Sequence, residues 1–158
     1  MRKSMITTKQ WDDMLDQIVK WAVLEEKRIL EQGVKLDHPH VQIARNVGVN
    51  NPEKIRVLEV SEVPLPNIQG LQTMLSDSNT SNILAITIRY GIFVRVPDWK
   101  SDRRMLTHEL VHSMQYERAG SIEKFLSRYL FECLSVGISQ TSSELEAISI
   151  EEKICGKT

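Results

Sequence analysis

The segment ILAITIRYGIFVRV is the most strand-like part of the chain, and it limits the folds that the chain can adopt. It spans Ile83 to Val96 and is rich in branched apolar residues, with Gly91 near its middle marking a bend, a bulge or a hairpin. An earlier alternating run, Ile55 to Val63, stops at a proline and predicts another strand. We therefore expect strands at about 55–63 and 83–97.

Helical patterns lie on both sides of the strand region. Apolar residues recur at helical spacing from Trp11, after a capping box of Thr7 and Gln10, and Gly33 ends that pattern. After the strands come three more helical patterns, the second with apolar residues at i, i+3, i+4 and i+7. The expected helices cover about 8–32, 101–119, 121–136 and 143–155. Because this order separates the strands from most helices, it predicts an α+β fold, not a doubly wound sheet.

Two polar stretches are expected to be irregular. Residues 34–54 contain Pro39, Gly48 and an Asn-Asn-Pro turn, which leave room for at most one short helix. Within them, His38 and His40 alternate around the proline without a helical or hairpin frame, so we expect a surface loop and not a second metal pair. The polar residues 69–82 are expected to form another loop.

Length and charge exclude several classes of protein. A chain of 158 residues with 41% hydrophobic and 26% charged residues predicts one domain over 1–158. With 20 basic and 21 acidic residues, no net field favours nucleic acid or anionic membranes. No segment has the apolar length of a membrane span or an export signal. Cys133 and Cys155 lack CxxC spacing and suit a reducing compartment. We expect a cytoplasmic protein without nucleic-acid or membrane partners. The sequence does not determine its oligomeric state.

The segment HELVH, residues 108–112, combines two histidines and a glutamate in a chemically meaningful pattern. On a helix, positions i and i+4 lie one turn apart on the same face, so His108 and His112 can reach one metal ion. Glu109 projects about 100° around the helix, where it can take a proton from a bound water without binding the metal. The pattern predicts a metal site with Glu109 as general base; the plain alternative is a solvated helix face.

A catalytic zinc site needs a third protein ligand and an open position for water. The segment TSSELEAISIEEK offers Glu144 and Glu146 at the start of the last helix, and Glu151 or Glu152 further along. Each of the first two has capping-box spacing to a preceding threonine or serine, so either could cap the helix. If Ser143 is the N-cap and Glu146 its partner, Glu144 is free to face the metal. The residues alone leave the choice open.

This order of segments resembles the zincin metallopeptidases, and within them the gluzincins, which pack a small mixed sheet on the motif helix, with further C-terminal helices. The resemblance covers about residues 83–154 and is carried by YGIFVRV, HELVH and ELEA. It implies Glu144 as the third ligand, and YGIFVRV as the strand whose edge pairs with an extended peptide. Ile148 is a departure, because membrane peptidases of this group have an aspartate there. ELEA is also similar to a segment of the ImmA/IrrE regulator peptidases, but we find no DNA-binding helix-turn-helix.

The resemblance implies a zinc-dependent peptidase that acts on peptide or protein substrates. His108, His112 and Glu144 would bind Zn²⁺, and Glu109 would move the proton during hydrolysis. The alternative is a zinc-binding regulatory or interaction module with little or no peptidase activity, which closed coordination by a fourth protein ligand would support.

Two tyrosines near the motif have two interpretations. Tyr116 and Tyr129 could each donate a hydrogen bond to an oxyanion. Tyr129 also completes the apolar stripe of its helix, which favours a packing role. The sequence assigns no role to Gln115.

Overall fold

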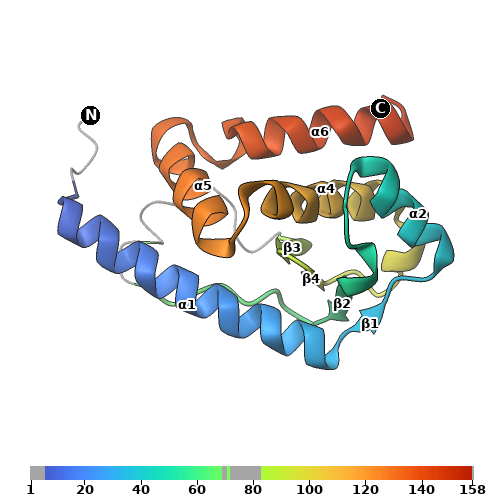
Figure 1. Cartoon of the computed structure of the whole chain (residues 1–158), viewed down its shortest axis with the longest axis horizontal. Coiled ribbons are helices and arrows are strands. Elements are labelled where there is room, and N and C mark those ends of the chain that lie inside the picture. Colours follow the sequence, from blue (N-terminus) through green and yellow to red (C-terminus); the bar gives the residue numbers. More distant parts are fainter. Residues whose placement is uncertain (1–5, 69–70, 72–82, 158) are drawn as a thin grey trace.

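The computed structural model describes residues 6–68, 71 and 83–157, and these form a mixed α+β fold (Figure 1). The described part contains five α-helices and a four-stranded sheet, which confirms the expected class. The helices are α1 (Thr8–Gln32), α2 (His38–Val47), α4 (Arg103–Ala119), α5 (Ile122–Val136) and α6 (Ser142–Cys155). The strands are β1 (Val34–Lys35), β2 (Arg56–Glu59), β3 (Ala85–Ile88) and β4 (Gly91–Val94).

The sheet has the strand order β1-β2-β4-β3, with β2 parallel to β4 and the other two pairs antiparallel. The expectation that YGIFVRV presents a free edge is therefore wrong, because β4 lies between β2 and β3. Among the described residues, the strands at the two edges are β1 and β3, and β3 packs against α4. The sequence pattern could not show which of the two strands lies at the edge, because both consist mainly of apolar residues.

The turn between β3 and β4 consists of Arg89 and Tyr90, directly before Gly91. Arg89 adopts the left-handed conformation with φ 53°, and Tyr90 completes the turn. Gly91 begins β4 instead, where α1 crosses the sheet: a Cβ at this position would lie 2.9 Å from Ile29 Cδ1. Of the bend, bulge or hairpin that the sequence left open, the structure shows a hairpin, and the glycine serves close packing of the helix on the strand.

Two apolar layers cover the sheet. Ile92 and Val94 belong to a buried cluster with residues of α2, α4 and α6, whereas Ile88 and Phe93 belong to a cluster with α1 and α5. Figure 1 shows α1 on one side of the strands, α4 on the other and α6 alongside α4. The sheet thus holds α4 in place, and α4 holds α6.

The capping box of Thr7 and Gln10 is present, and Gly33 caps the end of α1 as expected. Strand β2 is shorter than predicted: it ends at Glu59, before the prolines that follow.

The loop predicted at 69–82 lies outside the described residues, apart from Leu71. No helix in the described ranges is long and apolar enough to cross a membrane.

The surface loop predicted for His38 and His40 is wrong, because these residues begin α2. Asp37 caps this helix through His40 N–H, and Pro39 stands in its first turn, where a missing N–H costs nothing. His40 is buried against Trp99, with ring centroids 5.9 Å apart, and its Nε2 lies 3.0 Å from the carbonyl oxygen of Lys100. His40 therefore anchors α2, and it belongs to no cluster of metal ligands among the described residues.

A buried glutamate fixes α1 to the β3–β4 turn, and its removal should weaken the fold. The carboxylate of Glu26 accepts hydrogen bonds from Arg89 Nε at 2.8 Å, Arg89 Nη2 at 2.6 Å and Tyr90 N–H at 3.1 Å. We expect Glu26→Ala to lower the free energy of unfolding by roughly 2–3 kcal/mol in urea titrations. The control Asp16→Ala removes an exposed ion pair with Lys20 and should cost less than about 0.5 kcal/mol. Equal effects of the two substitutions would contradict a clamp role.

Candidate metal centre

Helix α4 presents both motif histidines to α6. Asp102 caps its start by accepting the Met105 N–H, and Gly120, at φ 99°, ends it. Between these caps the helix is regular, so His108 and His112 lie on one face with ring centroids 5.0 Å apart. Their Nε2 atoms point toward the same carboxylate, which comes from α6.

That carboxylate belongs to Glu144. Its Oε2 lies 3.0 Å from His108 Nε2, and its Oε1 lies 3.1 Å from His112 Nε2. Thr141, not Ser143, is the N-cap of α6, and its Oγ1 accepts a hydrogen bond from the backbone N–H of Glu144. The sequence left both residues open as the cap; the structure shows Thr141, and the Glu144 side chain faces the two histidines.

In the described part of the chain, one group of at least three His, Cys, Asp or Glu residues could hold a metal ion. It consists of His108, His112 and Glu144, whose ligand atoms all lie within 4.8 Å of one another. Two imidazole nitrogens and one carboxylate oxygen are the donor set of many zinc hydrolases, and they also suit ferrous iron. The group is half-buried to buried. It can hold a metal ion.

Glu151 contacts Nδ1 of His108, the ring nitrogen that faces away from Glu144, and the sequence did not predict this contact. His108 Nδ1–H donates to Glu151 Oε1 at 3.0 Å, and Glu151 also accepts from Arg104 Nη1 at 2.7 Å. Glu151 follows Glu144 by about two turns on the same face of α6. It makes the kind of contact for which the gluzincin resemblance expects an aspartate at Ile148, and it orients the ring with Nε2 toward Glu144.

The outward nitrogen of His112 is held by Gln115, which sequence reasoning left without a role. His112 Nδ1–H donates to Gln115 Oε1 at 2.8 Å, and Ser143 Oγ donates to the same oxygen at 2.6 Å. Gln115 Nε2 in turn donates to the Ser143 carbonyl at 3.0 Å and to Glu146 Oε1 at 2.8 Å. The i, i+3 spacing of His112 and Gln115 on one helix was the signal that could have identified this contact.

The alternative ligand Glu146 faces away from the histidines. Its carboxylate pairs with Arg118, at 2.6 Å from Nη2 and 3.0 Å from Nη1. These contacts and the one from Gln115 hold the pKa of Glu146 below its usual value. Glu146 thus braces α6 against α4 on the far side of His112.

Glu109 is buried and lies beside the cluster without joining it. Its Oε1 accepts a hydrogen bond from Thr87 Oγ1 at 2.9 Å, and the same hydroxyl lies 3.1 Å from the Glu109 carbonyl oxygen. Thr87 belongs to the edge strand β3, so the sheet fixes one oxygen of this carboxylate. Glu109, His112 and Glu144 line one cavity.

Charges inside the cluster oppose the effect of burial. Burial lowers the pKa of His108, but its hydrogen bond to Glu144 and the nearby carboxylates outweigh this effect and raise that pKa to about 9. Burial raises the pKa of Glu144, but its contacts with both histidines lower it to about 2. All four ring nitrogens of the two histidines face oxygen acceptors. The metal-free cluster is therefore an ion pair of imidazolium and carboxylate.

The two tyrosines pack in the interior next to the cluster. Tyr116 is buried against Phe125 with ring centroids 3.9 Å apart, and Tyr129 stacks on the same ring at 5.6 Å. Burial raises the pKa of both phenols. Both also line the cavity that contains His112 and Glu144. The packing interpretation of Tyr129 agrees with this position.

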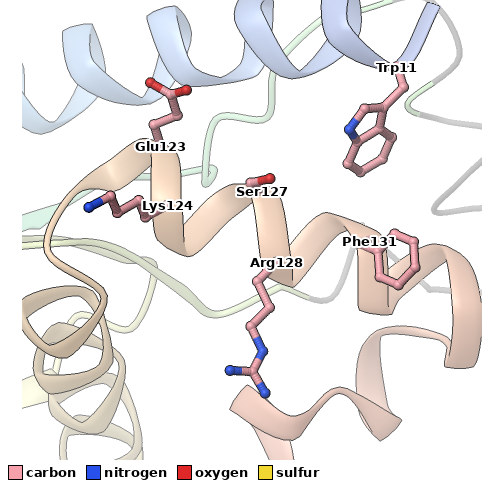
Figure 2. Close-up of a pocket in the computed structure, with 6 residues that line it drawn as sticks. All are labelled: Trp11, Glu123, Lys124, Ser127, Arg128 and Phe131. Atoms are coloured by element: carbon pink, nitrogen blue, oxygen red, sulfur yellow. The ribbon is translucent and has the colours of Figure 1, made fainter. Parts of the chain in front are cut away.

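The cavity at the cluster has a volume of about 320 Å³ and lies between α1, β3, α4 and α5. Another hollow, of about 440 Å³, lies between the start of α1 and the outer side of α5 (Figure 2). There Trp11 reaches from α1 toward α5, with Phe131 at the same end, and Arg128 extends away from both. That hollow is lined by no histidine or cysteine, so the chemistry of the described residues concentrates at the first cavity.

Comparisons of the chain with protein-family models, with curated proteins and with solved structures found no match. Function is therefore inferred from the geometry of the described residues.

Proposed function

We propose that the chain is a zinc-dependent metallopeptidase of the gluzincin type. His108, His112 and Glu144 would hold the metal, and Glu109 would act as general base. The observation that carries the proposal is the convergence of two helix-borne Nε2 atoms on one carboxylate, at 3.0 and 3.1 Å, while other side chains hold both Nδ1 atoms. These contacts fix the orientation that metal binding through Nε2 requires, because each Nδ1–H keeps its acceptor when Nε2 loses its proton to make way for a metal.

A zinc ion held by this donor set would supply a Lewis acid, which would activate a water and polarise the substrate carbonyl. Three protein ligands leave a position for the water. The described residues contribute no fourth ligand to the group, which favours a catalytic over a closed structural site and so weighs against the module alternative.

Glu109 is suited to move the proton. Thr87 occupies Oε1 of its carboxylate, which leaves Oε2 available to the cavity. In hydrolysis, Glu109 would accept a proton from the attacking water as the oxygen–carbon bond forms. It would then return this proton to the nitrogen of the leaving amine as the carbon–nitrogen bond breaks. The carboxylate ends the cycle ionised, as it began.

An extended peptide is the substrate that fits the edge of the sheet. Arg95 N–H donates to the Leu84 carbonyl at 2.8 Å, so the residue pair 84/95 is hydrogen-bonded in the antiparallel ladder. By alternation, the N–H and C=O groups of Ala85 and Thr87 point away from β4, toward the edge at which none of the described strands pairs with β3. A peptide paired with these groups would pass next to Glu109, whose carboxylate Thr87 contacts.

Metal binding should release protons at neutral pH. The pKa of His108 is raised from 6.5 to about 9, so its imidazole is protonated at pH 7.5 without metal, and a metal binds only the neutral ring. We expect at least one proton to be released per Zn²⁺ at pH 7.5, and the apparent affinity to rise about tenfold per pH unit up to about pH 9. Calorimetry in buffers of different ionisation enthalpy measures this number. A count of zero would contradict the ion-paired metal-free state.

Thr87 should position the general base. We expect Thr87→Val to lower kcat by roughly tenfold or more with little change in KM or zinc content, because Glu109 loses the donor that orients its carboxylate. Thr87→Ser should restore most of the activity. Thr107→Val is the matched control: its buried hydroxyl donates to the Arg103 carbonyl at 2.7 Å and touches no catalytic group. If both valine variants behave alike, Thr87 has only a structural role.

A further inference from the structure

We infer that the substrates are peptides with a bulky apolar side chain, which occupies the cavity beside the metal centre; this inference rests on the proposed peptidase function. The cavity of about 320 Å³ adjoins Glu109, His112 and Glu144 at one end. At roughly 30 Å³ per molecule, it has room for about ten waters. Its volume falls at the lower end of the range for ligand-binding cavities in proteins.

The walls of this cavity are apolar. Helix α1 contributes Ile18, Trp21 and Ala22, and α5 contributes Leu126 and Leu130. Among the described residues, the charged ones that line it are Glu109 and Glu144, which both lie at the cluster end. A charged side chain inserted between α1 and α5 would lose its hydration and find no opposite charge on these walls, whereas an apolar one would displace weakly held water.

The edge strand connects the cavity to the proposed substrate path. Ala85 and Thr87, whose backbone groups face the open edge, also line the cavity. In an extended peptide, successive side chains point to opposite faces, so alternate side chains of a peptide paired with β3 point toward α4. One of these would enter the cavity next to Glu109, which places the selected side chain beside the scissile bond.

A peptide library tests the specificity of the zinc-loaded protein. Peptides that differ at one position, with Leu, Phe, Ala, Asp or Lys, are compared by kcat/KM. We expect Leu and Phe to exceed Ala, Asp and Lys by roughly 10- to 100-fold at the position that enters the cavity. Hydrolysis without a preference for apolar residues at any position, or with a preference for charged ones, would overturn the inference and leave the peptidase proposal intact.

Two variants locate the preference in this cavity. Ala22 is 1% exposed and lines it, so Ala22→Leu should lower kcat/KM for the Phe peptide by at least tenfold and leave the Ala peptide nearly unchanged. Val23→Leu is the control, because Val23 is 47% exposed and does not line the cavity. Leu130→Ala enlarges the space instead and should shift the preference from Leu toward the larger Phe. An unaltered preference in both cavity variants would contradict this assignment.

Binding separates the two proposals. Zinc-loaded Glu109→Gln protein should bind fluorescein-labelled Leu and Phe peptides at least tenfold more tightly than Asp peptides, measured by anisotropy. If the wild-type protein cleaves no peptide but this binding preference is found, the peptidase proposal fails and the apolar site stands. If binding shows no preference, the apolar site is refuted, whatever the hydrolysis assay gives.

Discussion

Glu109→Gln should abolish peptide hydrolysis without removing the metal. The amide oxygen of glutamine can still accept the hydrogen bond from Thr87, at 2.9 Å in the native carboxylate, so the fold and the three ligand residues should be preserved. An amide cannot accept the proton of the attacking water, and loss of a general base costs roughly 10²- to 10⁴-fold in rate. We expect kcat to fall within or beyond that range while zinc content, measured by elemental analysis, stays near one per chain.

The control for this variant is Glu123→Gln, which removes the charge of an exposed glutamate on α5, away from the cluster. It should hydrolyse the mixed peptide library at the wild-type rate. Undiminished hydrolysis in Glu109→Gln would refute the role of Glu109 as base. Purified protein that holds iron and no zinc would instead contradict the peptidase proposal as a whole.

Three glutamates of α6 should differ in their effect on zinc affinity, and this series is the second large expected effect. Glu144→Ala removes the carboxylate that both Nε2 atoms face, and it should weaken zinc binding by more than about 100-fold. Glu151→Gln weakens the contact to His108 Nδ1 and the ion pair with Arg104 but leaves the three ligand residues in place, which predicts a loss of roughly 10- to 100-fold. Glu146→Ala removes the ion pair with Arg118 and should change zinc affinity least.

Competition with a chromophoric chelator measures the three affinities on one scale. All three substitutions lie on α6, so circular dichroism of each variant serves to check that this helix remains folded. If Glu146→Ala weakens zinc binding more than Glu144→Ala does, the ligand assignment is wrong. Equal losses in Glu144→Ala and Glu151→Gln would indicate that both carboxylates contact the metal.

The part of the fold predicted from sequence is the part that local physics decides. The bounds of α1 follow from the Thr7 capping box and Gly33, and those of α5 follow from its apolar spacing and Gly137. For residues 34–54 the sequence predicts at most one short helix, and it predicts a loop at His38 and His40 because a proline interrupts most regular structure. In the first turn proline is tolerated, and Asp37 supplies the cap.

The motif itself needed no tertiary information. Positions 108 and 112 share a face in any α-helix, so HELVH alone determined that two imidazoles lie together with Glu109 beside them. The order of strands before helices likewise determined an α+β fold.

Tertiary structure decided which groups surround that pair. Glu144, Glu146 and Glu151 are equivalent as acidic residues of α6, and only the rotation and approach of α6 on α4 turn Glu144 toward Nε2, Glu151 toward Nδ1 and Glu146 toward Arg118. The edge position of β3, which brings Thr87 to Glu109, depends on pairings between distant strands. Spacing along one helix fixes angles within that helix, whereas contacts between elements depend on packing that no local pattern encodes.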